Sequence, residues 1–486
     1  MRNKILFIIV IAITNFLFGN QQYIRLKTGI HFDSQVSGGK YSLEELAHII
    51  GKSDLDVAII TDHDNMEVRY GLPFFHKAFQ IPVRRNSIAS YGFDNYFNKI
   101  NTLNKFFPDV EIIPGIEAVP YYHWEGNPIF SELSLRNWHR HLLVFGMDEI
   151  DDYKELPSLK TGFPRQTSII EMITSNFHYY SVLFTILLVV FTLIFLSLKN
   201  HKVSRYSIII WVIATYIFTV EFPYSSNSIN QYNPQKSTLA YQNLINYVSQ
   251  KNGLIYWAHP EAEYEQEFQI PIIKQSMLMK TDKYSHLVYE TKNHSGFAGF
   301  WEGMKVLGKP EGLWDIALQE YCAGLRKMPQ FIIGELDFEE TNDLKLINET
   351  NTFIFAANKT HEAIFEAMRK GRMYTTRNFL GDKLVIDEFR VYNLENESSA
   401  FIGETLQVTN NPIAINIKIT ATQNISNQVF TLYRNKIPIK QLIINGSLDE
   451  WIVDENYPKT GKFYYKLYGG DDWINLVTNP IFVENR

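Results

Sequence analysis

Cysteine is almost absent from this chain of 486 residues, because Cys322 is its single example. One thiol excludes a disulfide framework and a zinc site built on cysteines, so the 13 histidines carry most of the information about metals. An excess of positive charge is also missing, since 46 Lys and Arg stand against 52 Asp and Glu, with a formal net charge of −6. That balance, without a clustered basic face, argues against nucleic acid binding.

Two catalytic signatures are missing as well. The sequence contains no G-x-S-x-G nucleophile elbow and no phosphate-binding G-x-x-x-x-G-K loop, which weakens serine-hydrolase and NTPase interpretations. It contains no internal repeat. The composition, 45% hydrophobic and 20% charged, is that of globular protein. At about 150 residues per domain, the length indicates about two or three domains.

The N-terminus predicts export. Arg2 and Lys4 precede an apolar run over residues 5–18 that stops at Gly19, the pattern of a signal peptide. An uncleaved N-terminal anchor over residues 1–20 is the alternative.

Two further apolar runs, residues 181–198 and 206–222, have about the length of membrane-spanning helices. They predict a transmembrane hairpin within residues 178–222, with a buried helical hairpin as the alternative. The loop between them carries Lys199, Lys202 and Arg205, which places it in the cytoplasm. We therefore expect a membrane protein of the cell envelope with its soluble domains on the extracytoplasmic (periplasmic or external) side. Because two spans return the chain to the side it left, one soluble domain can form from both flanking parts.

Those parts, residues 21–177 and 223–382, alternate short apolar strands with helical segments, which is the α/β pattern. Ser42 and Glu45 have capping-box spacing at the start of one helix. "DVAII", "QFIIGELD" and "HLVYET" are interpreted as strands. From about residue 383 to 486 the chain is rich in β-type segments, which predicts a C-terminal β-sandwich domain.

Ionisable residues recur at the ends of these strands, where α/β folds bind ligands. The set comprises His31, Asp33, Asp62, His63, Asp64, Glu117, His139, His141, His259, Asp337 and Glu339. In extended chain, His-x-Asp puts both side chains on one face, so one ion can engage both. Mixed His and carboxylate ligands suit Zn, Mn or Fe, and a carboxylate such as Glu117 can bridge two ions. For "TDHD" alone, a capped turn before a helix over residues 66–79 is the alternative.

The order H-x-D, T-D-H-D, P-G-I-E, H-L-L, A-H-P and G-x-x-D resembles the PHP family, named for polymerase and histidinol phosphatase. "LWDIAL", "AMRKGRMYTTRNF" and the β-rich C-terminus resemble its CehA/McbA-like metallohydrolase branch. The resemblance spans about residues 25–380. It implies a distorted (βα)7 barrel, here interrupted by the hairpin, and about one to three divalent ions. The implied ligands are His31, Asp33, His63, Glu117, His141, His259, Asp337 and Glu339.

Three positions depart from the family pattern. Asp33 and Glu339 stand where histidines are expected, and Gly38 stands where an aspartate is expected. The expected function is a metal-dependent phosphoesterase acting on a small-molecule ester through a metal-activated water, with Asp62, His63 and Asp64 in catalysis. A degenerate, non-catalytic metal- or ligand-binding module of the cell envelope is the alternative. A scaffold within a larger envelope complex is a third.

Overall fold

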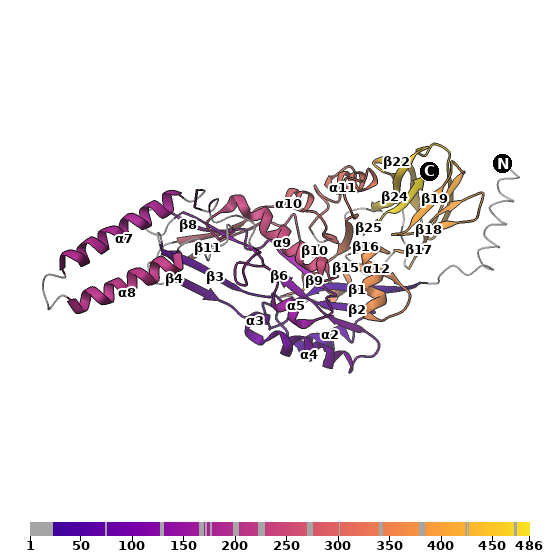
Figure 1. Ribbon diagram of the computed structural model, residues 1–486. Coiled ribbons are helices and arrows are strands. Elements are labelled where there is room, and N and C mark those ends of the chain that lie inside the picture. The colour runs from indigo at the N-terminus through magenta and orange to yellow at the C-terminus, as the bar shows by residue number, and fades with distance from the viewer. Residues whose placement is uncertain are drawn as a thin grey trace.

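The computed structural model contains helices and strands along most of the chain (Figure 1). Two central sheets carry the elements that are described first. The described residues are 23–72, 75–126, 131–164, 170, 173–174, 177–197, 204–221, 229–269, 276–300, 302–339, 344–378, 384–422, 425, 427–470 and 474–486. The predicted signal peptide or anchor over residues 1–20 lies outside them.

The first central sheet begins with three parallel strands. They are β1 (Ile24–Phe32), β2 (Val57–Ile60) and β5 (Glu111–Pro114), and β15 (Thr350–Ala356) and β16 (Met373–Asn378) continue the sheet beyond β1 in antiparallel fashion. β2 is buried along its length, as its apolar sequence predicts. Helix α4 (Phe93–Asn104) packs against β5, and α12 (His361–Arg369) packs against β15.

Helix α2 (Leu43–Ile50) follows β1 and confirms the predicted capping box. The Ser42 hydroxyl accepts a hydrogen bond from the Glu45 N–H, and the Glu45 carboxylate accepts one from the Ser42 N–H. Two orphan donors of the first turn are thereby satisfied. Short helices α3 (Ile88–Tyr91) and α5 (Ile150–Lys154) contact α4.

The second central sheet has the order β14-β13-β10-β9-β6. Its strands are β6 (Ile116–Ala118), β9 (Leu142–Phe145), β10 (Leu254–Trp257), β13 (Gly296–Phe300) and β14 (Phe331–Gly334). β10, β13 and β14 are parallel, whereas β9 is antiparallel to both of its neighbours. Helices α9 (Ser237–Gln250), α10 (Ser285–Glu290) and α11 (Leu313–Cys322) connect this part of the chain.

The two central sheets meet at two isolated bridges, Phe32 with Phe338 and His63 with Glu117. The chain passes from the first sheet to the second at Pro114 and Gly115. A side chain at Gly115 would begin 3.0 Å from the Thr61 Cγ2 and 3.1 Å from the Phe145 Cβ, so any larger residue would crowd both neighbours. Glu117 is therefore held at the junction of the sheets.

Two smaller sheets lie beside this junction. One contains β7 (His123–Glu125), β8 (Leu133–Arg136), β11 (Tyr264–Gln269) and β12 (Ser276–Thr281), and the other is the hairpin of β3 (Glu67–Leu72) and β4 (Phe75–Arg84). The helix considered for residues 66–79 is therefore wrong. "HLVYET" is also not a strand, because it forms α10. Both segments mix apolar and polar residues over a length too short for periodicity to separate helix from strand.

The C-terminal region is rich in strands, as the sequence predicts. One four-stranded sheet contains β17 (Leu384–Asn393), β18 (Ser399–Phe401), β20 (Ile413–Ala421) and β23 (Leu448–Asp454). The remaining strands are β19 (Thr405–Val408), β21 (Gln428–Arg434), β22 (Ile437–Ile444), β24 (Gly461–Gly470), β25 (Ile474–Thr478) and β26 (Ile481–Asn485). They extend the first central sheet through pairing of β25 with β16. The domain boundary at residue 383 stays a prediction.

The expected fold class is wrong in two respects. The strands expected to form one barrel sheet lie in two central sheets, which the chain connects at Pro114 and Gly115, with two smaller sheets beside them. Within the parts of the chain that the structure describes, no helix combines the length and apolar character that a membrane crossing needs. The predicted transmembrane hairpin is therefore wrong, and so are the membrane attachment and the localisation derived from it.

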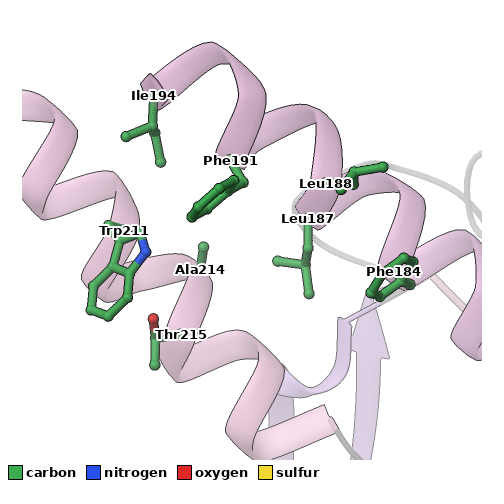
Figure 2. A pocket seen from close by; sticks show the side chains of 8 residues that line it. All are labelled: Phe184, Leu187, Leu188, Phe191, Ile194, Trp211, Ala214 and Thr215. Carbon is green, nitrogen blue, oxygen red and sulfur yellow. The ribbon is translucent and has the colours of Figure 1, made fainter. Parts of the chain in front are cut away.

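The two apolar runs form α7 (Phe177–Ser197) and α8 (Ser204–Glu221), which extend side by side away from the sheets (Figure 1). Leu187, Phe191 and Trp211 are among the side chains that line the space between the helices (Figure 2). α8 ends on β4, where the buried Glu221 carboxylate accepts hydrogen bonds from the N–H groups of Lys77 and Ala78 at 2.7 and 2.8 Å. Run length and hydropathy, which suggested a membrane hairpin, carry no information about this tertiary contact.

Candidate metal centre

Glu117, in the middle of β6, is the centre of a buried cluster of histidines. Its carboxylate lies 2.6 Å from His141 Nδ1, 3.0 Å from His63 Nδ1, 3.3 Å from His31 Nε2 and 3.4 Å from His259 Nε2. All five residues are less than a tenth exposed. The structure therefore brings together five residues that are spread over more than 200 positions of the sequence.

Strand direction explains this convergence. His31 lies near the end of β1, and His63 and His259 follow β2 and β10, so all three approach from the carboxyl ends of their strands. His141 precedes β9. Because β9 is antiparallel to β10, its beginning lies at the same edge, and the His141 carbonyl accepts a hydrogen bond from the Ala258 N–H.

A second group of ligand atoms adjoins the first. His31 Nε2 lies 3.6 Å from the Asp33 Oδ2 and 3.7 Å from the Asp337 Oδ1. His31 and Asp33 do offer ligand atoms to one group, as predicted, but the chain between them is not extended, because His31 has φ +75° and the β1–β2 register shifts there. The bulge turns both side chains toward the cluster.

These two groups each bring three ligand atoms within 4.8 Å of one another, His63 with Glu117 and His141, and His31 with Asp33 and Asp337. Within the described residues, His31 Nε2, Asp33 Oδ2, His63 Nδ1 and His141 Nδ1 are buried without a well-directed hydrogen bond, although the three ring nitrogens lie 2.6 to 3.3 Å from the Glu117 carboxylate. Unsatisfied buried polar atoms are rare in folded proteins and require an explanation. Buried imidazole and carboxylate atoms that converge without hydrogen bonds are compatible with a divalent metal ion.

In the metal-free cluster, the Glu117 carboxylate and the histidines around it shift one another's pKa values. Burial by itself would raise the pKa of Glu117, but its contacts with the surrounding histidines hold it well below its usual range. Burial opposes charging of His63, yet Glu117 raises the pKa of His63 to about 10. Burial also opposes charging of His259, yet Glu117, Glu335 and Asp337 together raise the pKa of His259 to about 9. For His141, burial outweighs Glu117 and lowers the pKa to about 4.

Asp62 and Asp64 lie beside the cluster and are engaged with backbone. The Asp62 carboxylate accepts hydrogen bonds from the N–H and hydroxyl groups of both Ser34 and Ser37, at 2.7 to 3.1 Å. The Asp64 Oδ1 accepts from the Val119 N–H at 3.2 Å. Burial raises the pKa of Asp64 to about 6. Both residues therefore hold the loops that carry Asp33 and Glu117, and their catalytic role stays a prediction.

Glu339 faces the position of Gly38. Its Oε2 lies 3.9 Å from the point where a side chain at Gly38 would begin. Burial, Asp337 and Glu117 raise the pKa of Glu339 to about 7. The Glu339 side chain thus places its carboxylate in the space beside Gly38.

Two residues near the cluster were not singled out as ligands by the sequence pattern. Glu335 is fully buried and contacts His31 and the backbone of His259. The Tyr284 hydroxyl lies 3.3 Å from His259 Nδ1. A signal existed for Glu335, because it directly follows the buried strand β14. His139 lies outside both ligand groups and packs its ring 3.8 Å from that of Tyr264.

No protein-family model and no curated protein matches the chain. Among solved structures, one match is a two-domain protein containing a predicted PHP-like metal-dependent phosphoesterase from Bacteroides vulgatus. The two are 12% identical, with a TM-score of 0.35, over 91% of this chain and 90% of that chain. A similarity of this size leaves the function to be argued from the site.

Proposed function

We propose that this protein is a metal-dependent hydrolase of the PHP type, acting as a phosphoesterase on a small-molecule ester. The observation that carries the proposal is the convergence of four buried histidines on the Glu117 carboxylate at 2.6 to 3.4 Å. A bridging carboxylate between histidines is the donor set that hydrolases with two metals use. The motif order in the sequence supports the same class.

In this proposal, His63, Glu117 and His141 hold one divalent ion, and His31, Asp33 and Asp337 hold a second, with His259 and Glu339 beside them. Zn, Mn or Fe fit this mixed nitrogen and oxygen set. When bound, the metal supplies polarisation of the ester oxygen and lowers the pKa of water toward neutrality. The chain's own contribution is to orient the ligands: Asp62 fixes the loop after Asp33 through Ser34 and Ser37, and Asp64 fixes the strand end after Glu117.

The test is turnover of p-nitrophenyl phosphate and bis-p-nitrophenyl phosphate by purified protein reconstituted with Mn²⁺ or Zn²⁺. His63→Ala should lower turnover by at least about 100-fold, because a ligand and its contact with Glu117 are lost. His48→Ala is the matched control, since this exposed histidine on α2 contacts Phe107 and lies outside both ligand groups. Metal retained without turnover across an ester panel would favour the non-catalytic binding module, which the altered positions Asp33, Gly38 and Glu339 motivate.

A further inference from the structure

Glu335 connects two of the segments that carry the histidine cluster. It is fully buried directly after β14. Its Oε2 lies 3.1 Å from His31 Nδ1, and its Oε1 accepts a hydrogen bond from the His259 N–H at 2.5 Å. One carboxylate thus holds a side chain at the end of β1 and a backbone group at the end of β10.

The backbone of Glu335 is itself fixed on both sides. Its N–H donates to the Phe300 carbonyl at 2.7 Å, and the next N–H, of Leu336, donates to the Ile30 carbonyl at 2.8 Å. The backbone that carries the carboxylate is therefore anchored to β13 and β1.

The two ring nitrogens of His31 face different partners. Nδ1 faces Glu335, whereas Nε2 faces Glu117, Asp33 and Asp337 at 3.3 to 3.7 Å. An ionised carboxylate only accepts hydrogen bonds. When a metal takes Nε2, the proton of His31 must lie on Nδ1, where Glu335 is its acceptor at 3.1 Å.

Both segments also have unusual backbone. His31 has φ +75° and His259 has φ +24°, in the left-handed region that residues with side chains rarely adopt. Such conformations persist where surrounding contacts determine them. Glu335 supplies a contact to each residue.

We propose that Glu335 is a positioning residue that sets the tautomer and ring orientation of His31 and fixes the His259 segment, so that metal affinity depends on a residue that is not itself a ligand. The inference rests on the metal centre of the proposed function and adds a residue to it.

Glu335→Gln is the sharpest variant, because glutamine keeps the size and offers one oxygen and one NH₂ group. If the oxygen stays on the His259 N–H, the NH₂ faces His31 Nδ1 and favours the proton on Nε2, where the metal would bind. We expect affinity for Mn²⁺ or Zn²⁺ to fall by about 10- to 100-fold. The measurement is equilibrium competition with a chelating indicator dye, which does not depend on turnover.

Glu261→Gln is the matched control. Glu261 is similarly buried and accepts hydrogen bonds from the N–H groups of Lys305, Val306 and Leu307 at 2.7 to 2.8 Å. Glu261 lies on the same loop as His259, but its carboxylate contacts residues 305–307 instead of the cluster, so its substitution should leave metal affinity at the wild-type value. Circular dichroism of the metal-free variants checks that both are folded.

Wild-type affinity in Glu335→Gln, or an equal loss in Glu261→Gln, would overturn the proposal. If Glu335→Gln does not fold, Glu335→Asp is measured instead, because a side chain shorter by one methylene cannot contact both His31 and His259. A weakened metal affinity in Glu335→Asp supports the proposal, and an unchanged affinity overturns it. Absence of metal in the wild type would overturn the metal centre and this inference together. Metal binding that depends on Glu335, without ester turnover, would support the inference and overturn only the enzymatic activity.

Discussion

The buried ion pair between Lys466 of β24 and Asp315 of α11 allows a quantitative prediction about how the C-terminal strands are attached. The Lys466 Nζ lies 2.6 Å from the Asp315 Oδ1, and both side chains are fully buried. Asp315 also accepts hydrogen bonds from the Tyr464 hydroxyl at 2.6 Å and the Glu311 N–H at 2.8 Å. Asp315→Asn would leave the ammonium group buried without its counter-charge. We expect the free energy of unfolding to fall by about 3–5 kcal/mol.

Lys466→Met should cost less, because Asp315 keeps the Tyr464 and Glu311 donors. Burial lowers the pKa of Lys466 and Asp315 offsets part of that effect. Without Asp315 the folded state binds this proton more weakly than the unfolded state, so the stability of Asp315→Asn should rise from pH 7 to pH 10. Urea denaturation at both pH values measures these quantities. A loss below about 1 kcal/mol in Asp315→Asn, or an equal loss in Lys466→Met, would refute the reasoning.

Two further predictions concern the metal centre. His63 and His259 hold protons in the metal-free protein, with pKa values of about 10 and about 9. Because metal must displace these protons, the affinity for Mn²⁺ should rise between pH 7 and pH 9. Calorimetry in buffers of different ionisation enthalpy should detect the released protons. A metal affinity that does not change with pH would contradict this prediction. Asp62→Asn loses one acceptor of the Ser34 and Ser37 hydrogen bonds, so it should destabilise by about 1.5–3 kcal/mol in thermal or urea unfolding and keep its metal. Lost turnover at unchanged stability would instead place Asp62 in the chemistry.

Local patterns made several elements predictable. The Ser42–Glu45 capping box depends on interactions within one stretch of chain, and the apolar run of β2 is typical of a buried strand; the structure contains both. The apolar runs of α7 and α8 predicted helices, but the packing of α8 on β4 through Glu221 is tertiary and left no mark in hydropathy.

The candidate site was predictable as a set of residue types and less so as geometry. The sequence places His31 and Asp33 on one strand face, whereas a bulge with φ +75° at His31 brings them together in the structure. Glu335 was missed although it directly follows a buried strand, because its role depends on contacts with two segments far away in sequence.

The central claim is that the histidine cluster around Glu117 binds metal. Elemental analysis of purified protein, after incubation with Mn²⁺ or Zn²⁺ and dialysis, tests it most directly. We expect at least about one equivalent of tightly held metal in the wild type. Glu117→Gln should lose most of that metal, because it removes the negative charge of the carboxylate that all four histidines contact. Wild-type protein without metal, or Glu117→Gln with the wild-type amount, would contradict it.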